Sequence, residues 1–161
     1  MDISELILQR RIVFKGTLFM IKNQNYLPWQ PSGMQGRYNG DGTYAYYFGD
    51  TLMTCCGEIL KHTPKARCED YRFWAVTIES GTFIDICAVE GTQYLLSRDE
   101  GGYGYTQELS NRLADKNVFG FRYISQPTFT QGTYGTCFCI YQSALNLGKE
   151  YFREIIWGSS K

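Results

Sequence analysis

Three polar residues in apolar or turn-rich surroundings are the first candidates for chemistry. Arg37 lies in a glycine-rich segment, residues 28–43, Glu58 lies in the largely apolar segment 51–62, and Ser125 ends the segment 118–125. A guanidinium binds a phosphate through paired hydrogen bonds, a carboxylate supplies negative charge, and a hydroxyl donates a hydrogen bond. Each residue also has an ordinary structural interpretation, since loop arginines and helix glutamates are usually solvated and a serine at a strand end usually caps a turn.

Other kinds of site have weaker support in the sequence. His62 is the only histidine, and its setting in KHTPKAR is typical of a solvated helix end rather than of a catalytic base. The six cysteines contain no Cys-x-x-Cys pair, so no metal site is expected. The glycine-rich segment lacks Gly-Lys-Ser/Thr, and no G-x-G-x-x-G opens a helix, so it is not a known phosphate-binding fingerprint.

Length and composition indicate one globular domain over residues 1–161. Sixteen basic residues balance sixteen acidic ones, which argues against direct nucleic-acid binding. A hydrophobic content of 43% excludes a disordered chain, and 13 Tyr and 10 Phe favour strands. The N-terminal segment is not a signal peptide, and no apolar run approaches a membrane span. We therefore expect a cytoplasmic protein with buried, free thiols and no membrane partner.

The pattern of apolar residues and turn signals predicts an α+β fold with a mixed or largely antiparallel sheet. Strands are expected over residues 12–21, 44–48, 71–78, 82–88, 118–125 and 135–142. Helices are expected over residues 51–62, with Asp50 as N-cap, and 106–116, with Thr106 as N-cap. The tail, residues 148–160, fits either a strand or a short helix. In the first helix, helical spacing directs Leu52, Cys55, Cys56 and Ile59 to the core and Glu58 to the margin of that face.

The segment GRYNGDGTYAYYFGDTLMTCCGEIL, residues 36–60, resembles the signature of the RES domain family, which is named after an arginine, a glutamate and a serine. Arg37, Tyr47 and Glu58 occupy the family positions, and Ser125 falls on the family serine within residues 104–126. The resemblance covers about residues 14–142, and residues 143–161 extend the same domain. Met20 stands where many members have an arginine.

The resemblance implies a fold similar to ADP-ribosyltransferases of the diphtheria-toxin type. Many RES domains are toxins of bacterial toxin–antitoxin pairs that consume NAD as glycohydrolases or phosphorylases. It also implies a partner, an antitoxin with a helix-turn-helix part that plugs the active site, and a possible homodimer. NAD would be a substrate, so no cofactor is expected.

The resemblance also implies roles for particular residues. Glu58 would stabilise the oxocarbenium that forms when the nicotinamide–ribose bond breaks, and Arg37 would bind the pyrophosphate. Tyr47 would face the cationic nicotinamide ring, and Ser125 would donate a hydrogen bond to a phosphate or ribose oxygen. The expected NAD-binding residues are Arg37, Tyr38, Asn39, Tyr46, Tyr47 and Ser125.

Three functions remain open from the sequence. The first is an NAD glycohydrolase or phosphorylase that acts as an intracellular toxin. The second is an ADP-ribosyltransferase that modifies a protein target. The third is a catalytically silent RES-like domain that binds a nucleotide or a partner, which Met20 favours, whereas Arg37, Tyr47, Glu58 and Ser125 favour an enzyme.

Overall fold

A computed structural model of the chain describes residues 3–33, 38–39, 43–87, 104–113, 117–125 and 135–156. These residues form six strands and short helices, which confirms the predicted α+β class with a mixed sheet. The strands are β1 (Arg11–Asn23), β2 (Ala45–Gly49), β3 (Tyr71–Asp85), β4 (Gly120–Ile124), β5 (Thr136–Tyr141) and β6 (Phe152–Ile155). The helices are α1 (Ile3–Leu8), α2 (Leu52–His62), α4 (Gly104–Asn111) and the 3₁₀ turns η1 (Cys68–Asp70) and η2 (Lys149–Tyr151).

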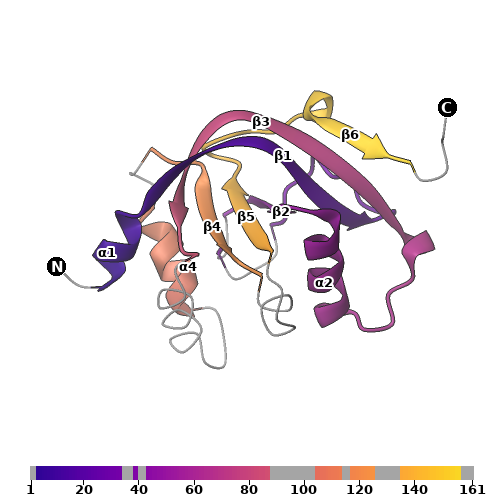
Figure 1. Cartoon of the computed structure of the whole chain (residues 1–161), viewed down its shortest axis with the longest axis horizontal. Helices are drawn as coiled ribbons and strands as arrows, with labels where there is room; N and C mark the ends of the chain where they lie inside the picture. Colours follow the sequence, from indigo (N-terminus) through magenta and orange to yellow (C-terminus); the bar gives the residue numbers. More distant parts are fainter. Residues whose placement is uncertain are drawn as a thin grey trace.

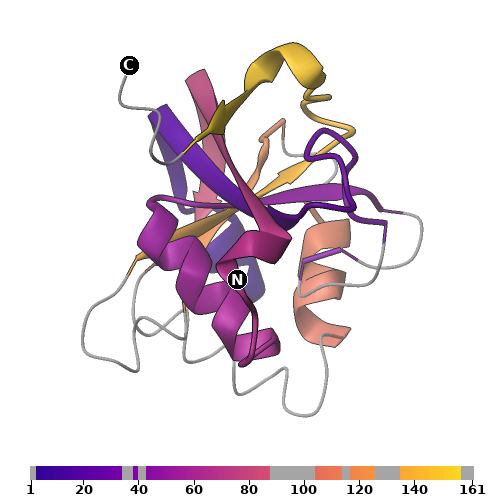
Figure 2. The ribbon, with the colours of Figure 1, turned by 90° about the vertical axis from the view of Figure 1, so that its right-hand side faces the viewer.

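Five strands pair in a closed ring. The long strands β1 and β3 run antiparallel from Arg11↔Ile84 to Asn23↔Tyr71, and together they arch over the molecule (Figure 1). β1 also meets β2, β2 pairs with β5, β5 with β4, and β4 with β3, the last in parallel. β6 lies along the first half of β3. In Figure 1, β4 and β5 lie between α4 and α2, and the turned view in Figure 2 agrees.

Alternating side chains of the ring build two cores on its opposite faces. We call the first the inner core; its buried members come from β1, β2, β3, β5 and the segment before β6, and include Leu18, Tyr46, Phe83, Phe138 and Leu147. The outer core lies between the sheet and helices α1 and α4, and includes Leu8, Ile84, Leu109, Phe121 and Cys139. Burying each large apolar side chain contributes about 1.5–3 kcal/mol, so the sheet faces hold most of the stability.

β3 is one strand, whereas the sequence predicts two strands separated by Glu79-Ser80-Gly81. A register shift places Phe14↔Gly81 beside Gly16↔Ile78, so β3 has one more residue than β1 in this interval. This bulge reverses the side-chain alternation, because Ile78 before it and Phe83 after it both enter the inner core. Gly81 is not a turn residue. A Cβ there would lie 2.5 Å from the Phe119 ring, so glycine makes room for that side chain.

The helix boundaries also differ from the expected ones. The N-cap of α2 is Thr51 and not Asp50: Thr51 Oγ1 accepts the Thr54 N–H at 3.1 Å, and Asp50 accepts the Thr54 hydroxyl at 2.7 Å. The second helix, α4, begins at Gly104, so Thr106 lies inside it and is buried. The tail contains both expected alternatives, because the turn η2 leads directly into β6.

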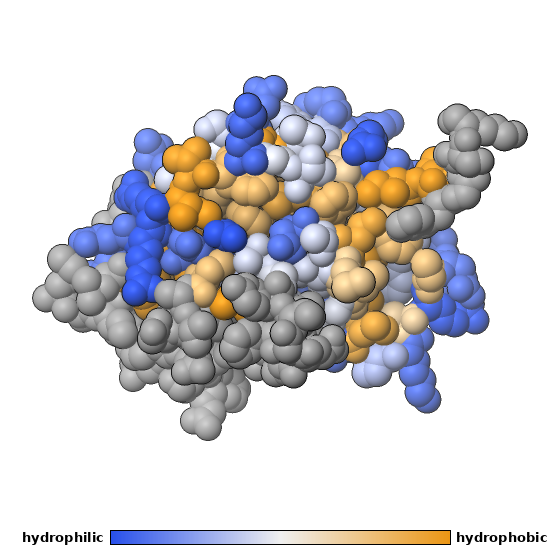
Figure 3. Space-filling view, in the orientation of Figure 1, coloured by the Kyte–Doolittle hydropathy of each residue, from blue (hydrophilic) through white to orange (hydrophobic). Residues whose placement is uncertain are grey.

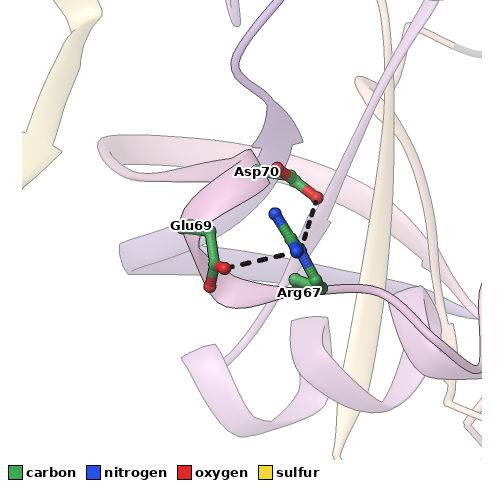
Figure 4. A network of polar contacts seen from close by, with 3 residues as sticks. All are labelled: Arg67, Glu69 and Asp70. Carbon is green, nitrogen blue, oxygen red and sulfur yellow. Dashed lines mark ion pairs between the residues drawn. The ribbon is translucent and has the colours of Figure 1, made fainter.

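An exposed ion-pair network lies around η1, in the connection between α2 and β3 (Figure 4). Arg67 Nε lies 3.4 Å from Glu69 Oε1 and 3.6 Å from Asp70 Oδ2. Because the Arg67 and Glu69 side chains are each 68% exposed, solvent screens the pair and it adds little stability. Glu69 is therefore a surface carboxylate that can serve as a control for Glu58.

In Figure 3, apolar side chains reach the surface at the start of β1 beside α1, beside β6 toward the C-terminal end, and over α2. The exposed residues include Val13 and Ile156. In the part of the chain that is described, no helix is both long enough and apolar enough to span a bilayer.

Candidate functional site

Helix α2 carries Glu58 close to the centre of the sheet because two glycines leave room for the helix. A Cβ on Gly49 would lie 2.7 Å from Cys55 Sγ, and a Cβ on Gly135 would lie 1.8 Å from Thr54 Oγ1. The Cys55 thiol also donates to the Phe19 carbonyl oxygen at 3.2 Å. Thr54 and Glu58 are four residues apart and share one side of the helix, so the packing of Thr54 against Gly135 also directs Glu58 toward the sheet.

Glu58 contacts the start of β5. Its Oε1 accepts a hydrogen bond from Cys137 Sγ at 3.4 Å, and Cys137 is only 4% exposed. Glu58 itself is partly exposed, at the margin of the buried face as the helical spacing predicts. The prediction for Cys56 is wrong, because this residue is exposed and Thr54 is buried in its place.

Tyr47 lies on the same face of the sheet as Cys137. It stands opposite Cys139 in the β2–β5 register, two pairs away from Gly49 and Cys137. Its hydroxyl donates to Asn39 Oδ1 and accepts the Tyr38 N–H at 3.4 Å. Tyr47 is partly exposed, and its hydroxyl joins β2 to Tyr38 and Asn39 in the segment before it.

The two residues that follow Arg37 are firmly held. Asn39 is fully buried and its Nδ2 donates to the carbonyl oxygens of Thr43 and Ser32 at 3.1 and 3.4 Å. The Tyr38 carbonyl accepts the Tyr141 hydroxyl at 2.5 Å, and the Tyr38 ring packs 4.6 Å from the Tyr123 ring. Arg37 itself lies outside the described residues.

The structure does not bring Tyr46 to this site. Tyr46 enters the inner core on the opposite face of the sheet, where its hydroxyl donates to the Leu147 carbonyl oxygen at 3.2 Å. This follows from strand alternation, since Tyr46 and Tyr47 are consecutive in β2.

Ser125 lies on the correct face but is fully buried just beyond β4. Its N–H donates to the Gly135 carbonyl oxygen at 2.9 Å. Gly135 in turn packs against Thr54 of α2, so the Ser125 backbone holds the residue that α2 contacts.

Two residues of this site were missed from the sequence, Tyr123 and Cys137. They stand directly opposite each other in the β4–β5 register, and Tyr123 is partly exposed. The alternation in strand 118–125 places Tyr123 on the face of Ser125, a signal that could have identified it. We call Glu58, Tyr47, Tyr123 and Cys137 the carboxylate cluster.

The cluster contains one carboxylate among groups that are kept uncharged. Burial raises the pKa of Cys137 and of the Tyr47 and Tyr123 hydroxyls well above the ordinary values, and it raises the pKa of the adjacent Cys139 to about 12. These thiols and phenols therefore remain neutral near pH 7. No group of three His, Cys, Asp or Glu suited to a metal ion occurs among the described residues.

Comparison with known proteins places the chain in a family. The RES domain family matches residues 18–148, which include Arg37, Tyr47, Glu58 and Ser125. The fold is similar to that of a chain in the crystal structure of the M. tuberculosis MbcT–MbcA toxin–antitoxin complex, with a TM-score of 0.67 and 14% identity over 96% of this chain and 91% of that one. No curated protein matches significantly. Since the family match spans most of the sequence, the chain belongs to the RES domain family.

Proposed function

We propose that this protein is an NAD-degrading enzyme that cleaves the nicotinamide–ribose bond, as a glycohydrolase or phosphorylase, and acts as an intracellular bacterial toxin. The observation that carries the proposal is the position of Glu58, a partly exposed carboxylate that contacts Cys137 on the sheet face that also carries the partly exposed Tyr47 and Tyr123. Membership of the RES domain family and the similarity to a chain of a toxin–antitoxin complex support it.

The proposed reaction needs a fixed negative charge. When the bond between the nicotinamide nitrogen and ribose C1′ breaks, the electron pair leaves with nicotinamide and positive charge develops on the ribose. Water or phosphate then forms the new bond at C1′, and the proton of the attacking group is released. A preorganised carboxylate beside the ribose stabilises this charge more in the transition state than in bound NAD, which lowers the barrier. Glu58 has this role in the proposal.

The tyrosines and the arginine would bind the rest of NAD. Tyr47 and Tyr123 are neutral, partly exposed residues on the sheet face that Glu58 contacts, and an aromatic face attracts the cationic nicotinamide. Arg37 precedes the anchored Tyr38 and would pair with the pyrophosphate. Tyr38, Asn39 and Ser125 are buried, so we assign them to support of the site.

The proposed partner is a cognate antitoxin, which would bind over the carboxylate cluster and exclude NAD. The structural neighbour comes from a toxin–antitoxin complex, which supports a protein partner of this kind. A helix-turn-helix part in that partner would supply the DNA binding that the balanced charge of this chain does not favour.

The decisive experiment compares Glu58→Gln with Glu69→Gln. Purified protein is incubated with NAD, with and without phosphate, and the products are identified. Removing a preorganised charge commonly lowers the rate about 10²–10³-fold, so we expect Glu58→Gln to lose at least about a hundredfold while keeping its fold. Glu69 is a solvated carboxylate of the same size, so Glu69→Gln should cleave NAD at the wild-type rate.

The products distinguish the alternatives. Release of nicotinamide without a protein acceptor supports the glycohydrolase or phosphorylase, and ADP-ribose 1-phosphate in phosphate buffer identifies the phosphorylase. Modification of an added protein, without cleavage in its absence, would replace the proposal by ADP-ribosyl transfer. Binding of intact NAD without turnover, or equal rates for wild type and Glu58→Gln, would refute it.

A further inference from the structure

We propose that Cys137 is a positioning residue, whose buried thiol orients the Glu58 carboxylate by donating a hydrogen bond to Oε1. The inference rests on the proposed function of Glu58. It concerns the 3.4 Å contact between Cys137 Sγ and Glu58 Oε1, which joins β5 to α2 across the face of the sheet.

The backbone around Cys137 is fixed on both sides. Cys137 stands opposite Gly49 of β2 and Tyr123 of β4, so its strand has hydrogen-bonded neighbours in both directions. Gly49 has no side chain, so α2 approaches closely on that side. With a 4% exposed side chain, the thiol has little freedom to rotate away from Glu58.

The direction of this hydrogen bond follows from the charge states. Burial raises the pKa of the Cys137 thiol well above its ordinary value, and the Glu58 carboxylate raises it further, because a thiolate beside a carboxylate is repelled. Cys137 therefore keeps its proton and acts only as donor. A carboxylate has no proton to donate, so the pair is S–H to Oε1.

Other titratable groups near the pair are neutral thiols and phenols, with one exception. They comprise Cys55 on α2, Cys139 on β5, Tyr47 on β2 and Tyr123 on β4, all with pKa values raised by burial. The exception is Asp50 at the start of α2, whose negative charge also raises the pKa of Cys137. The thiols and phenols therefore stay neutral between pH 4 and 7. The Cys137 thiol donates to the charged form of the Glu58 carboxylate and therefore disfavours protonation of that carboxylate. A mutation of Cys137 can remove this donor selectively.

The test measures NAD cleavage against pH for Cys137→Ala, Cys137→Ser and the control Cys55→Ala. Losing a donor to the charged form should move the acidic limb of kcat/KM to higher pH by about half to one unit and lower kcat about three- to tenfold in Cys137→Ala. Serine restores a donor, so Cys137→Ser should recover part of both. Cys55→Ala removes a similarly buried thiol that bonds the Phe19 carbonyl, so it should leave the acidic limb unchanged.

The inference is overturned if Cys137→Ala has the same acidic limb of kcat/KM as the wild type, with or without a loss of rate. If the Cys137 variants do not fold, the S–H stretching bands of the wild type and of Glu58→Gln are compared by Raman spectroscopy. Replacing a charged acceptor by an amide weakens the bond, so one S–H band should shift; identical spectra overturn the inference.

Failure of the proposed function looks different from failure of the inference. If the wild type does not cleave NAD, or Glu58→Gln cleaves it normally, the proposed function fails. The thiol contact then remains testable by the Raman comparison of the wild type with Glu58→Gln, in which one S–H band should shift.

Discussion

Gly49→Ala tests whether the close approach of α2 to the sheet places Glu58. The added Cβ would lie 2.7 Å from Cys55 Sγ, 3.2 Å from the Thr51 carbonyl oxygen and 3.3 Å from the Cys55 nitrogen. The sulfur contact is impossible as it stands, because real Cβ atoms essentially never approach heavy atoms below 3.0 Å. Relief requires either rotation of Cys55, which breaks its hydrogen bond to Phe19, or movement of the first turn of α2.

The size of the effect follows from these distances. Overpacking of this kind costs about 1–3 kcal/mol of unfolding free energy, and a domain of this size loses about 2–4 °C in Tm for each kcal/mol. A helix shift of several tenths of an ångström also carries Glu58 away from Cys137. A displacement of about 1 Å at a reacting group can cost about a hundredfold in rate, so we expect a loss of about 10- to 100-fold in kcat.

The assay is a double-mutant cycle with Gly49→Ala, Cys55→Ala and the double variant, each measured by thermal unfolding and by NAD cleavage. Without the sulfur, only the contacts at 3.2 and 3.3 Å remain, and these relax by a few tenths of an ångström. The double variant should therefore recover most of the activity that Gly49→Ala loses, with a coupling of about 0.5–3 kcal/mol. If Gly49→Ala loses stability but retains the wild-type kcat, the close approach of α2 to Gly49 does not determine the position of Glu58.

Two further predictions concern Arg37 and the buried thiols. If Arg37 clamps the pyrophosphate, Arg37→Lys should weaken NAD binding, because lysine lacks the planar fork; an unchanged NAD titration would indicate a structural arginine. The pKa values of Cys55 and Cys139 are about 12 in the folded protein against 9.0 ordinarily, so above pH 9 the unfolded state binds fewer protons. The free energy of unfolding in urea should therefore fall from pH 9 toward pH 12, and a value that is flat or rising over this range would contradict these shifts.

The sequence predicts the elements well where local pattern and tertiary packing agree. Helix α2 and strands β1, β2 and β5 lie within one or two residues of their expected bounds. The prediction fails at Glu79-Ser80-Gly81, where polar residues and glycine resemble a turn. There the partner strand β1 continues without interruption, and the extra residue is absorbed as a bulge. Such a decision depends on a strand about sixty residues away, which local pattern cannot supply.

The site is predictable only in part, for a related reason. The motif spacing identifies Glu58 and Tyr47, and strand alternation separates Tyr46 from Tyr47 once the position of each strand is known. Cys137 and Tyr123 enter the site through cross-strand register, which pairs residues 14 positions apart in the sequence. A search for polar residues also overlooks Cys137, because a buried cysteine usually behaves as a small apolar side chain.

Small residues therefore determine where the Glu58 carboxylate lies. Gly49 and Gly135 leave room for the helix, and Cys137 supplies a hydrogen-bond donor to Glu58 Oε1. The packing of α2 also explains why Glu58 occurs in the apolar segment CCGEIL. Cys55 holds the buried side of the helix against the sheet, and Glu58 lies at the margin of that side. A carboxylate held in this way can face a positively charged ribose, as the proposed reaction requires.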